Sequence, residues 1–184
     1  MRHFADFKSL KSVELILDYD WPLQSSVMPR VERLKVSSGK LTELEGINRI
    51  FPNIKELRVD RITDLLKAFK SIEECTNVVK LTIDTFQNKA LRTPLRMPNL
   101  KHLHVIKCDI TRCPFDTDGV QLEELIVEAN EDSSWLIDYL KLENTKLNRL
   151  KLVNFEVMSR LRKALDKKRH KIKDLEFEKV KFYL

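Results

Sequence analysis

The chain has 184 residues, of which 34% are charged and 42% are apolar, and its formal net charge at pH 7 is +6. This composition suits a folded domain with a core of useful size, and no run approaches the roughly 18 apolar residues that a membrane span requires. Three cysteines without a C-x-x-C pair argue against a disulfide framework or a zinc knuckle, so we expect reduced thiols in a cytoplasmic or nuclear protein.

A nine-residue pattern recurs along the whole chain, as in "MPRVERLKV" (28–36), "FPNIKELRV" (51–59) and "MPNLKHLHV" (97–105). Its central apolar position recurs at intervals of 21 to 25 residues, at Val13, Leu34, Leu57, Leu81, Leu103, Leu125, Leu150 and Leu175. Such self-similarity is typical of an array in which each unit buries its apolar face against the next. We therefore expect one domain over 1–184, built of about eight units.

Each copy alternates apolar and polar residues around its centre, which predicts a short strand. In the fifth copy Leu103 and Val105 would face the core, whereas His102, His104 and Ile106 would face the other way. The predicted fold class is α/β, with a curved parallel sheet on the concave side and helices and loops on the convex side.

The segments between strands carry helical patterns at 42–51, 64–75, 133–144 and 159–170. For the first we expect a capping box of Thr42 and Glu45, weakened by Gly46. The side chains expected to face inward are Leu65, Leu66, Phe69 and Ile72 in the second segment, Trp135, Leu136, Tyr139 and Leu140 in the third, and Leu161 and Leu165 in the fourth. The segment 111–119, with Pro114 and Gly119, predicts an irregular loop.

The stretch "LKHLHVIKCDI" resembles the L-x-x-L-x-L-x-x-[N/C]-x-L consensus of leucine-rich repeats, in the cysteine-containing form of F-box/leucine-rich-repeat proteins. "LEELIVEANED" matches with Asn130 at the polar position, whereas Gly39, Ile62, Phe86, Phe155 and Val180 stand there in other copies. The resemblance implies a solenoid that binds a protein, as the substrate-receiving part of a ubiquitin ligase receptor. That role requires an F-box, which we do not find in this sequence, so the chain would then be a fragment of a longer one. A stand-alone adaptor or scaffold requires no such addition.

The outward strand positions form the candidate binding surface, since a concave sheet of mixed charge suits a protein partner. The partner-binding candidates are Arg33, Lys35, Arg58, Lys80, His102, His104, Ile126, Arg149 and Lys151. The alternative is a merely solvated face, with the contacts made by loops or termini.

No residues predict an enzyme, a cofactor or a small-molecule substrate. His102, His104 and Glu124 could approach one another across the sheet, but no fourth metal ligand is evident, so no metal site is predicted. Cys108 would fill space in the turn after its strand, and nothing near Cys113 argues for a lowered thiol pKa.

A basic run, "RLRKALDKKRHKIK" (160–173), supplies much of the net charge. Such a run can form a nucleic-acid or nuclear-localisation patch, but it is more often the solvated side of a convex helix, here anchored by Leu161 and Leu165. The patch candidates are Arg160, Arg162, Lys163, Lys167, Lys168 and Arg169. Aromatic residues are not interleaved with them, which argues against recognition of single strands.

Overall fold

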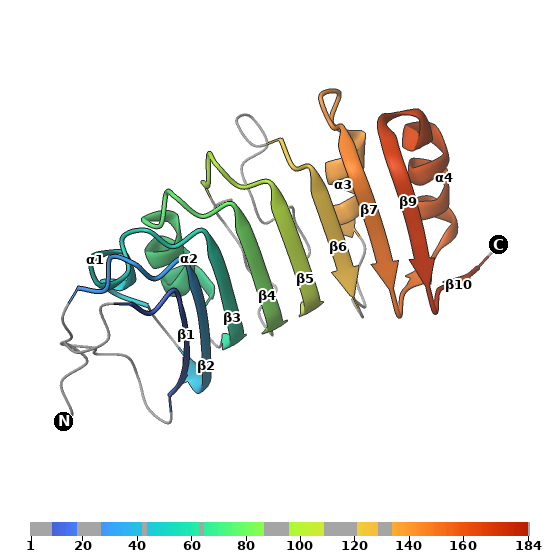
Figure 1. Cartoon of the computed structure of the whole chain (residues 1–184). Coiled ribbons are helices and arrows are strands. Elements are labelled where there is room, and N and C mark those ends of the chain that lie inside the picture. Colours follow the sequence, from blue (N-terminus) through green and yellow to red (C-terminus); the bar gives the residue numbers. More distant parts are fainter. Residues whose placement is uncertain are drawn as a thin grey trace.

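The computed structural model describes residues 9–17, 27–41, 44–62, 65–86, 96–108, 121–128 and 134–183. Its main feature is an eight-stranded parallel sheet in which the strands follow one another in chain order (Figure 1). The strands are β1 (Ser12–Leu17), β2 (Arg33–Leu41), β3 (Glu56–Ile62), β4 (Lys80–Phe86), β5 (His102–Cys108), β6 (Glu124–Glu128), β7 (Leu147–Val153) and β9 (Ile172–Glu178). The expected α/β class and parallel sheet are thereby confirmed.

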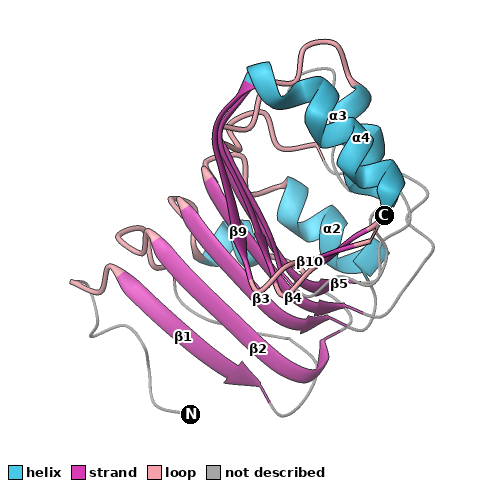
Figure 2. Ribbon diagram, turned by 90° about the vertical axis from the view of Figure 1, so that its right-hand side faces the viewer, coloured by secondary structure: helices cyan, strands magenta, loops and turns pink. Residues whose placement is uncertain are grey.

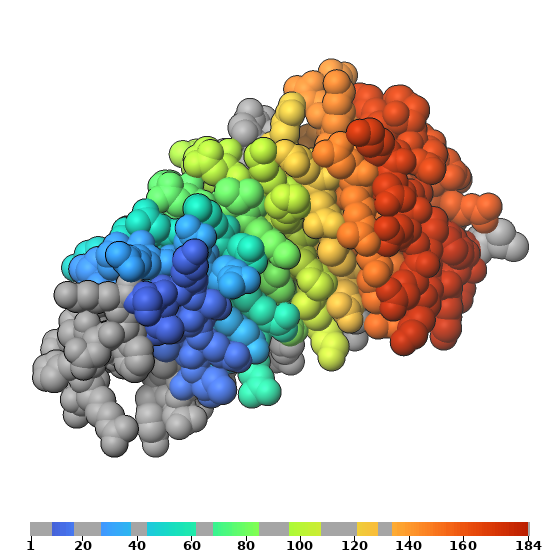
Figure 3. All heavy atoms as spheres, in the orientation of Figure 1, coloured from blue at the N-terminus to red at the C-terminus, as the bar shows by residue number. Residues whose placement is uncertain are grey.

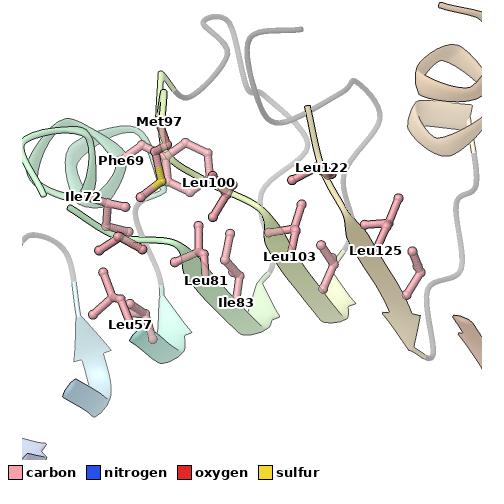
Figure 4. Close-up of a cluster of buried hydrophobic side chains, with 14 of the residues drawn as sticks. Leu57, Phe69, Ile72, Leu81, Ile83, Met97, Leu100, Leu103, Leu122 and Leu125 are labelled. Carbon is pink, nitrogen blue, oxygen red and sulfur yellow. The ribbon is translucent and has the colours of Figure 1, made fainter. Parts of the chain in front are cut away.

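The register places all eight predicted central positions, from Val13 to Leu175, in one ladder across the sheet. From β2 to β7 the leucine at this position is fully buried, as is the next inward residue two positions later. Side chains from neighbouring strands, such as Leu81 and Leu103, lie side by side beneath Met97 and Leu100 (Figure 4). The core is therefore a continuous apolar layer along one face of the sheet.

The helices lie on this apolar face of the sheet (Figure 2). They are α1 (Ile47–Ile50), α2 (Leu65–Glu73), α3 (Ser134–Lys141) and α4 (Ser159–Lys168), and a 3₁₀ turn, Arg169–Lys171, follows α4. The inward residues predicted for α3 and α4 are buried, as are Phe69 and Ile72 of α2. The side chains of Leu65 and Leu66 and the predicted loop at 111–119 lie outside the described residues.

The helix predicted at 42–51 is wrong in extent, because α1 is a single turn that begins after Gly46. Gly46 has φ 75°, a left-handed conformation that an α-helix cannot contain and that glycine adopts without steric cost. Glu45 of the predicted capping box therefore precedes the helix, and Thr42 lies outside the described residues.

A second left-handed position recurs at the C-terminal ends of the strands. Arg61, Lys107, Asn154 and Lys179 have φ between 49° and 59°, and each stands four residues after the central leucine of its copy. This conformation costs a residue with a Cβ atom about 1 kcal/mol, so the surrounding packing must hold it. The turn redirects the chain, and the next residue, Phe155 in the seventh copy, is buried.

The C-terminal segment adds a small second sheet, in which β10 (Lys181–Phe182) pairs in parallel with β8 (Glu156–Val157). The alternation of Val180, Phe182 and Leu184 with other residues predicts that they seal the last unit; Leu184 lies outside the described residues. Val180 packs against the core, whereas Phe182 is 48% exposed and meets Phe177 edge to face, with the ring centroids 5.2 Å apart. Of the helices described, none has the length and apolar character needed to cross a bilayer.

The assignment of residues to the two faces of the sheet can be tested with two adjacent residues of β6. Leu125→Ala should lower the free energy of unfolding by about 2–5 kcal/mol, because it opens a cavity in the buried layer. Ile126→Ala, on the opposite and half-buried side, should cost less than about 1.5 kcal/mol. Urea unfolding measures both, and equal losses would contradict the assigned facing.

Candidate functional site

The sheet face opposite the helices is formed by three outward positions of each strand, and we call it the open face (Figures 2 and 3). The register joins these positions into three ladders. The first is Ser12, Arg33, Glu56, Lys80, His102, Glu124, Arg149 and Asp174; the second Glu14, Lys35, Arg58, Thr82, His104, Ile126, Lys151 and Glu176; the third Ile16, Ser37, Asp60, Asp84, Ile106, Glu128, Val153 and Glu178. All nine predicted partner-binding residues lie on the first two ladders.

Arg58 is the centre of an ion-pair network in the N-terminal half of the open face. Its Nε lies 2.8 Å from Oδ1 of Asp60, and its Nη2 lies 2.9 Å from Oδ2 of Asp84. Asp60 is only 9% exposed, and its Oδ2 accepts a 3.0 Å hydrogen bond from the Ser37 hydroxyl. The Nζ of Lys35 lies 2.6 Å from Glu14 Oε1 and 3.8 Å from Asp60 Oδ2. Arg58 and Lys35 therefore hold carboxylates of the chain itself.

Arg33 and Lys80 differ from these two, because both are exposed and form no ion pair with any residue in the described part of the chain. They flank Glu56 in the first ladder. Arg33, Lys80, Arg58 and His104 contribute to the lining of a hollow of about 420 Å³ on the open face. The structure thus brings two cations with unused hydrogen-bonding capacity to the rim of a concavity.

The two histidines of β5 each approach a different carboxylate. His102 Nδ1 lies 3.4 Å from Glu124 Oε2, and His104 Nε2 lies 3.5 Å from Glu128 Oε2. Burial lowers the pKa of His104, and the neighbouring Glu128 opposes this only in part, so His104 is neutral at pH 7. Across the described ranges, no three side chains of the metal-ligating kinds gather into a potential metal site.

Arg149 dominates the C-terminal half, where it bridges three strands. Its Nη1 lies 2.8 Å from Glu124 Oε1, and its Nε and Nη2 lie 2.9 and 2.8 Å from the two carboxylate oxygens of Glu176. Lys151 Nζ pairs with Glu178 Oε2 at 2.8 Å. These hydrogen bonds lower the pKa of Glu176 and Glu178 and raise the pKa of Lys151.

One apolar side chain of the open face, that of Ile106, is less exposed than we expected. Ile126 and Val153 are half-buried, but Ile106, which we expected to be exposed, is only 8% exposed. It lies in the third ladder between Asp84 and Glu128 and does not belong to the apolar cluster on the other face of the sheet. Ile126 therefore stays a candidate contact residue, whereas Ile106 offers little surface to a partner.

The open face is net acidic although the chain is basic. Its three ladders carry six Lys or Arg against nine Asp or Glu, a formal charge of −3, whereas the whole chain carries +6. The excess positive charge therefore lies elsewhere, and the open face as a whole does not attract polyanions.

The structure also changes which residues of the basic run can belong to an exposed patch. Lys168 is only 8% exposed and its Nζ donates a 2.6 Å hydrogen bond to the carbonyl of Leu142, just beyond the end of α3. Burial lowers the pKa of Lys168. The prediction that Lys168 belongs to an exposed patch is therefore wrong, because it satisfies a carbonyl left open at a helix end. Arg160, Arg162, Lys163, Lys167 and Arg169 are exposed as predicted.

Three asparagines make equivalent hydrogen bonds that we did not predict from the sequence. The Nδ2 atoms of Asn53, Asn77 and Asn99 donate to the carbonyls of Pro29, Pro52 and Thr76, at 2.8, 3.0 and 2.9 Å. Each asparagine stands four residues before the central leucine of its copy, directly ahead of a buried apolar residue, and that constant place was the available signal. Lys171, at the equivalent place in the last copy, donates to the carbonyl of Glu143.

Among the cysteines, only Cys75 has a described side chain. It is buried, and burial raises the pKa of its thiol to about 12, which leaves no thiolate at neutral pH. Cys113 and the side chain of Cys108 lie outside the described residues.

Comparisons with known proteins give no relative: no protein-family model matches the chain, and neither does any curated protein or solved structure. The leucine-rich-repeat assignment therefore stays a prediction from the sequence pattern.

The contact between His104 and Glu128 predicts that replacing Glu128 changes the pKa of His104. Glu128→Gln removes the carboxylate that raises the pKa of His104, so this pKa should fall further below its ordinary value. Histidine ring resonances followed by NMR against pH measure the change. A pKa of His104 that rises in the variant would show that Glu128 does not stabilise the imidazolium.

The Arg149–Glu176 contact predicts an acid-dependent change in stability. Because the folded-state pKa of Glu176 is lowered, its contribution is complete above the ordinary pKa of about 4.5 and is lost as the pH falls through the lower folded value. In Arg149→Gln the pKa of Glu176 should return toward its ordinary value. Unfolding midpoints measured between about pH 5 and pH 2 should then fall less steeply than in the parent chain; an unchanged slope would contradict the assignment.

Proposed function

We propose that the chain is a leucine-rich-repeat solenoid of about eight units that binds another protein on its open face. The proposal is supported first by the regularity of the structure: one strand per copy, one register across the sheet, and a left-handed residue at the same place in four copies. A sheet held by a continuous apolar layer presents its outward side chains on a fixed backbone. Binding then requires little ordering of the receptor, which favours affinity.

The observation that carries the proposal is the contrast between paired and unpaired cations around the hollow. Arg58 and Lys35 are oriented by carboxylates of the chain, whereas the side chains of Arg33 and Lys80 donate no hydrogen bond to any described residue. A partner that places a carboxylate beside Arg33 or Lys80 gains a charge-assisted hydrogen bond without breaking an existing one. Ile126 and Val153, half-buried on the same face, offer apolar contact area.

This arrangement separates two roles among the predicted residues. Arg33, Lys80, His102 and Ile126 are proposed to contact the partner directly. Lys35, Arg58, Arg149 and Lys151 hold neighbouring carboxylates and so keep the surface in one conformation, and His104 lies beside Glu128.

The F-box resemblance gives the first partner class to test, a protein delivered to a ubiquitin ligase. The second class is an assembly partner of a stand-alone adaptor or scaffold. The two have the same contact chemistry on the open face, so the identity of the captured protein distinguishes them.

The test is capture from nuclease-treated lysate by Arg33→Glu/Lys80→Glu and by the parent chain, read by mass spectrometry. Reversing these charges should remove the partner while leaving the ion pairs of Arg58 and Arg149 intact. The matched control is Lys11→Glu/Arg30→Glu, which makes the same charge change at exposed residues outside the three ladders. Proteins lost by the first variant and kept by the control would support the proposal; equal capture by all three chains would refute it.

A further inference from the structure

The positive charge of the chain is concentrated in one segment. Residues 159–173 contain eight Lys or Arg and one Asp, a formal charge of +7, so the rest of the chain, with 26 Lys or Arg and 27 Asp or Glu, carries −1. This segment forms α4, the 3₁₀ turn after it and the first residues of β9, at one end of the sheet (Figure 1).

Helix α4 separates its cations from its apolar residues. Leu161 and Leu165 are buried with Lys168 on one side. The exposed cations occupy the remaining circumference: Arg160, Arg162, Lys163 and Lys167, continued by Arg169 and Lys173 after the helix. Ten residues of helix rise about 15 Å, so four of these cations lie along a short straight rod.

These six cations are unpaired in the described part of the chain, in contrast to the cations of the C-terminal half of the open face. Arg169 donates one hydrogen bond to the carbonyl of Ile172, and the others have no described partner. Asp166 is the only carboxylate in the segment. Six exposed like charges this close repel one another, and a polyanion relieves that repulsion.

Helix α4 itself presents no large apolar side chain to solvent. Among described residues, the exposed large apolar side chains are Ile16, Val27, Met158, Phe177, Phe182 and Tyr183; Met158 directly precedes α4, and the last three lie in and after β9 and β10. A protein interface has an apolar centre, and a membrane-bound amphipathic helix inserts its apolar side. The apolar side of α4 is already in the core, so insertion into a bilayer would require the helix to leave the fold.

We propose that α4 and the turn after it bind the phosphate backbone of a nucleic-acid duplex, without reading its sequence. A duplex carries about one negative charge per 1.7 Å of axis, so a length equal to α4 offers about nine charges to the exposed cations. Contacts of this kind need neither stacking aromatics nor base-edge donors. This surface is separate from the open face, and its occupation is independent of the protein partner.

The test is fluorescence anisotropy of a 20-bp DNA duplex and a 20-bp RNA duplex of arbitrary sequence, titrated with the full chain at 50 to 200 mM salt. The logarithm of affinity should fall linearly with that of salt concentration, with a slope of about −3 to −5. Arg160→Gln/Lys163→Gln/Lys167→Gln should weaken binding at least about tenfold and reduce the slope by about 3. Glutamine keeps helix propensity, and circular dichroism confirms that the variant is folded.

The matched control is Lys11→Gln/Arg30→Gln/Lys70→Gln, which removes the same charge at exposed residues of β1, β2 and α2 and their flanks. It should keep duplex affinity within about twofold of the parent chain, since these residues lie outside the proposed contact. Equal losses in the two variants would show a mere effect of net charge and overturn the proposal. It is also overturned by the absence of duplex binding at 50 mM salt, or by tighter binding to phosphatidylserine vesicles or polyglutamate than to either duplex. A difference between the DNA and RNA arms identifies the preferred duplex.

Discussion

The apolar ladder through Leu34, Leu57, Leu81, Leu103, Leu125 and Leu150 is the constraint on which the other features depend. Side chains alternate across a strand, so slipping any strand by one residue would exchange this ladder for charged residues in the core. The cost of that exchange fixes the register, and the register fixes the open face. Arg149 lies between Glu124 and Asp174 because Leu150 lies between Leu125 and Leu175.

The ion pairs that result add little stability individually. Exposed pairs contribute about 0–1 kcal/mol each, and those of Lys35, Arg58 and Arg149 are partly exposed. Their larger effect is to hold long side chains in one position. The unpaired cations, Arg33 and Lys80 on the sheet and those of α4 on the helical side, then stand out as the charges left for other molecules.

The sequence was sufficient to predict the strands, their facing and most of the helices, because these depend on local periodicity. Leu125 and Val127 face inward and Glu124 and Ile126 outward, as a period of two requires. Trp135 and Leu165 are buried by the same reasoning at helical spacing. The lengths of helices were less predictable: α1 begins later than predicted because Gly46 adopts a left-handed conformation.

The finer features of the site depend on distances between side chains of different copies. The repeat pattern of the sequence does not determine these distances. Arg33 and Arg149 occupy equivalent positions in their copies, yet of the two only Arg149 reaches two carboxylates in the described part of the chain, one on each neighbouring strand. Lys168 differs from Lys167 only by a rotation of about 100° around the helix, but that rotation brings its amine to the end of α3. Likewise, Lys107 and Lys179 carry no residue-type signal for positive φ, since glycine or asparagine would be expected there.

The order of the strands has a mechanical consequence. Each strand of the large sheet is hydrogen-bonded only to its neighbours in the chain, with β1 and β9 at opposite edges. Tension applied to the two ends would therefore load one strand interface at a time, and the resistance would be that of a single interface and not of the whole sheet. A released copy of about 23 residues, extended at roughly 3.5 Å per residue, lengthens the chain by about 80 Å. Such a molecule would yield in steps, as a soft extensible element.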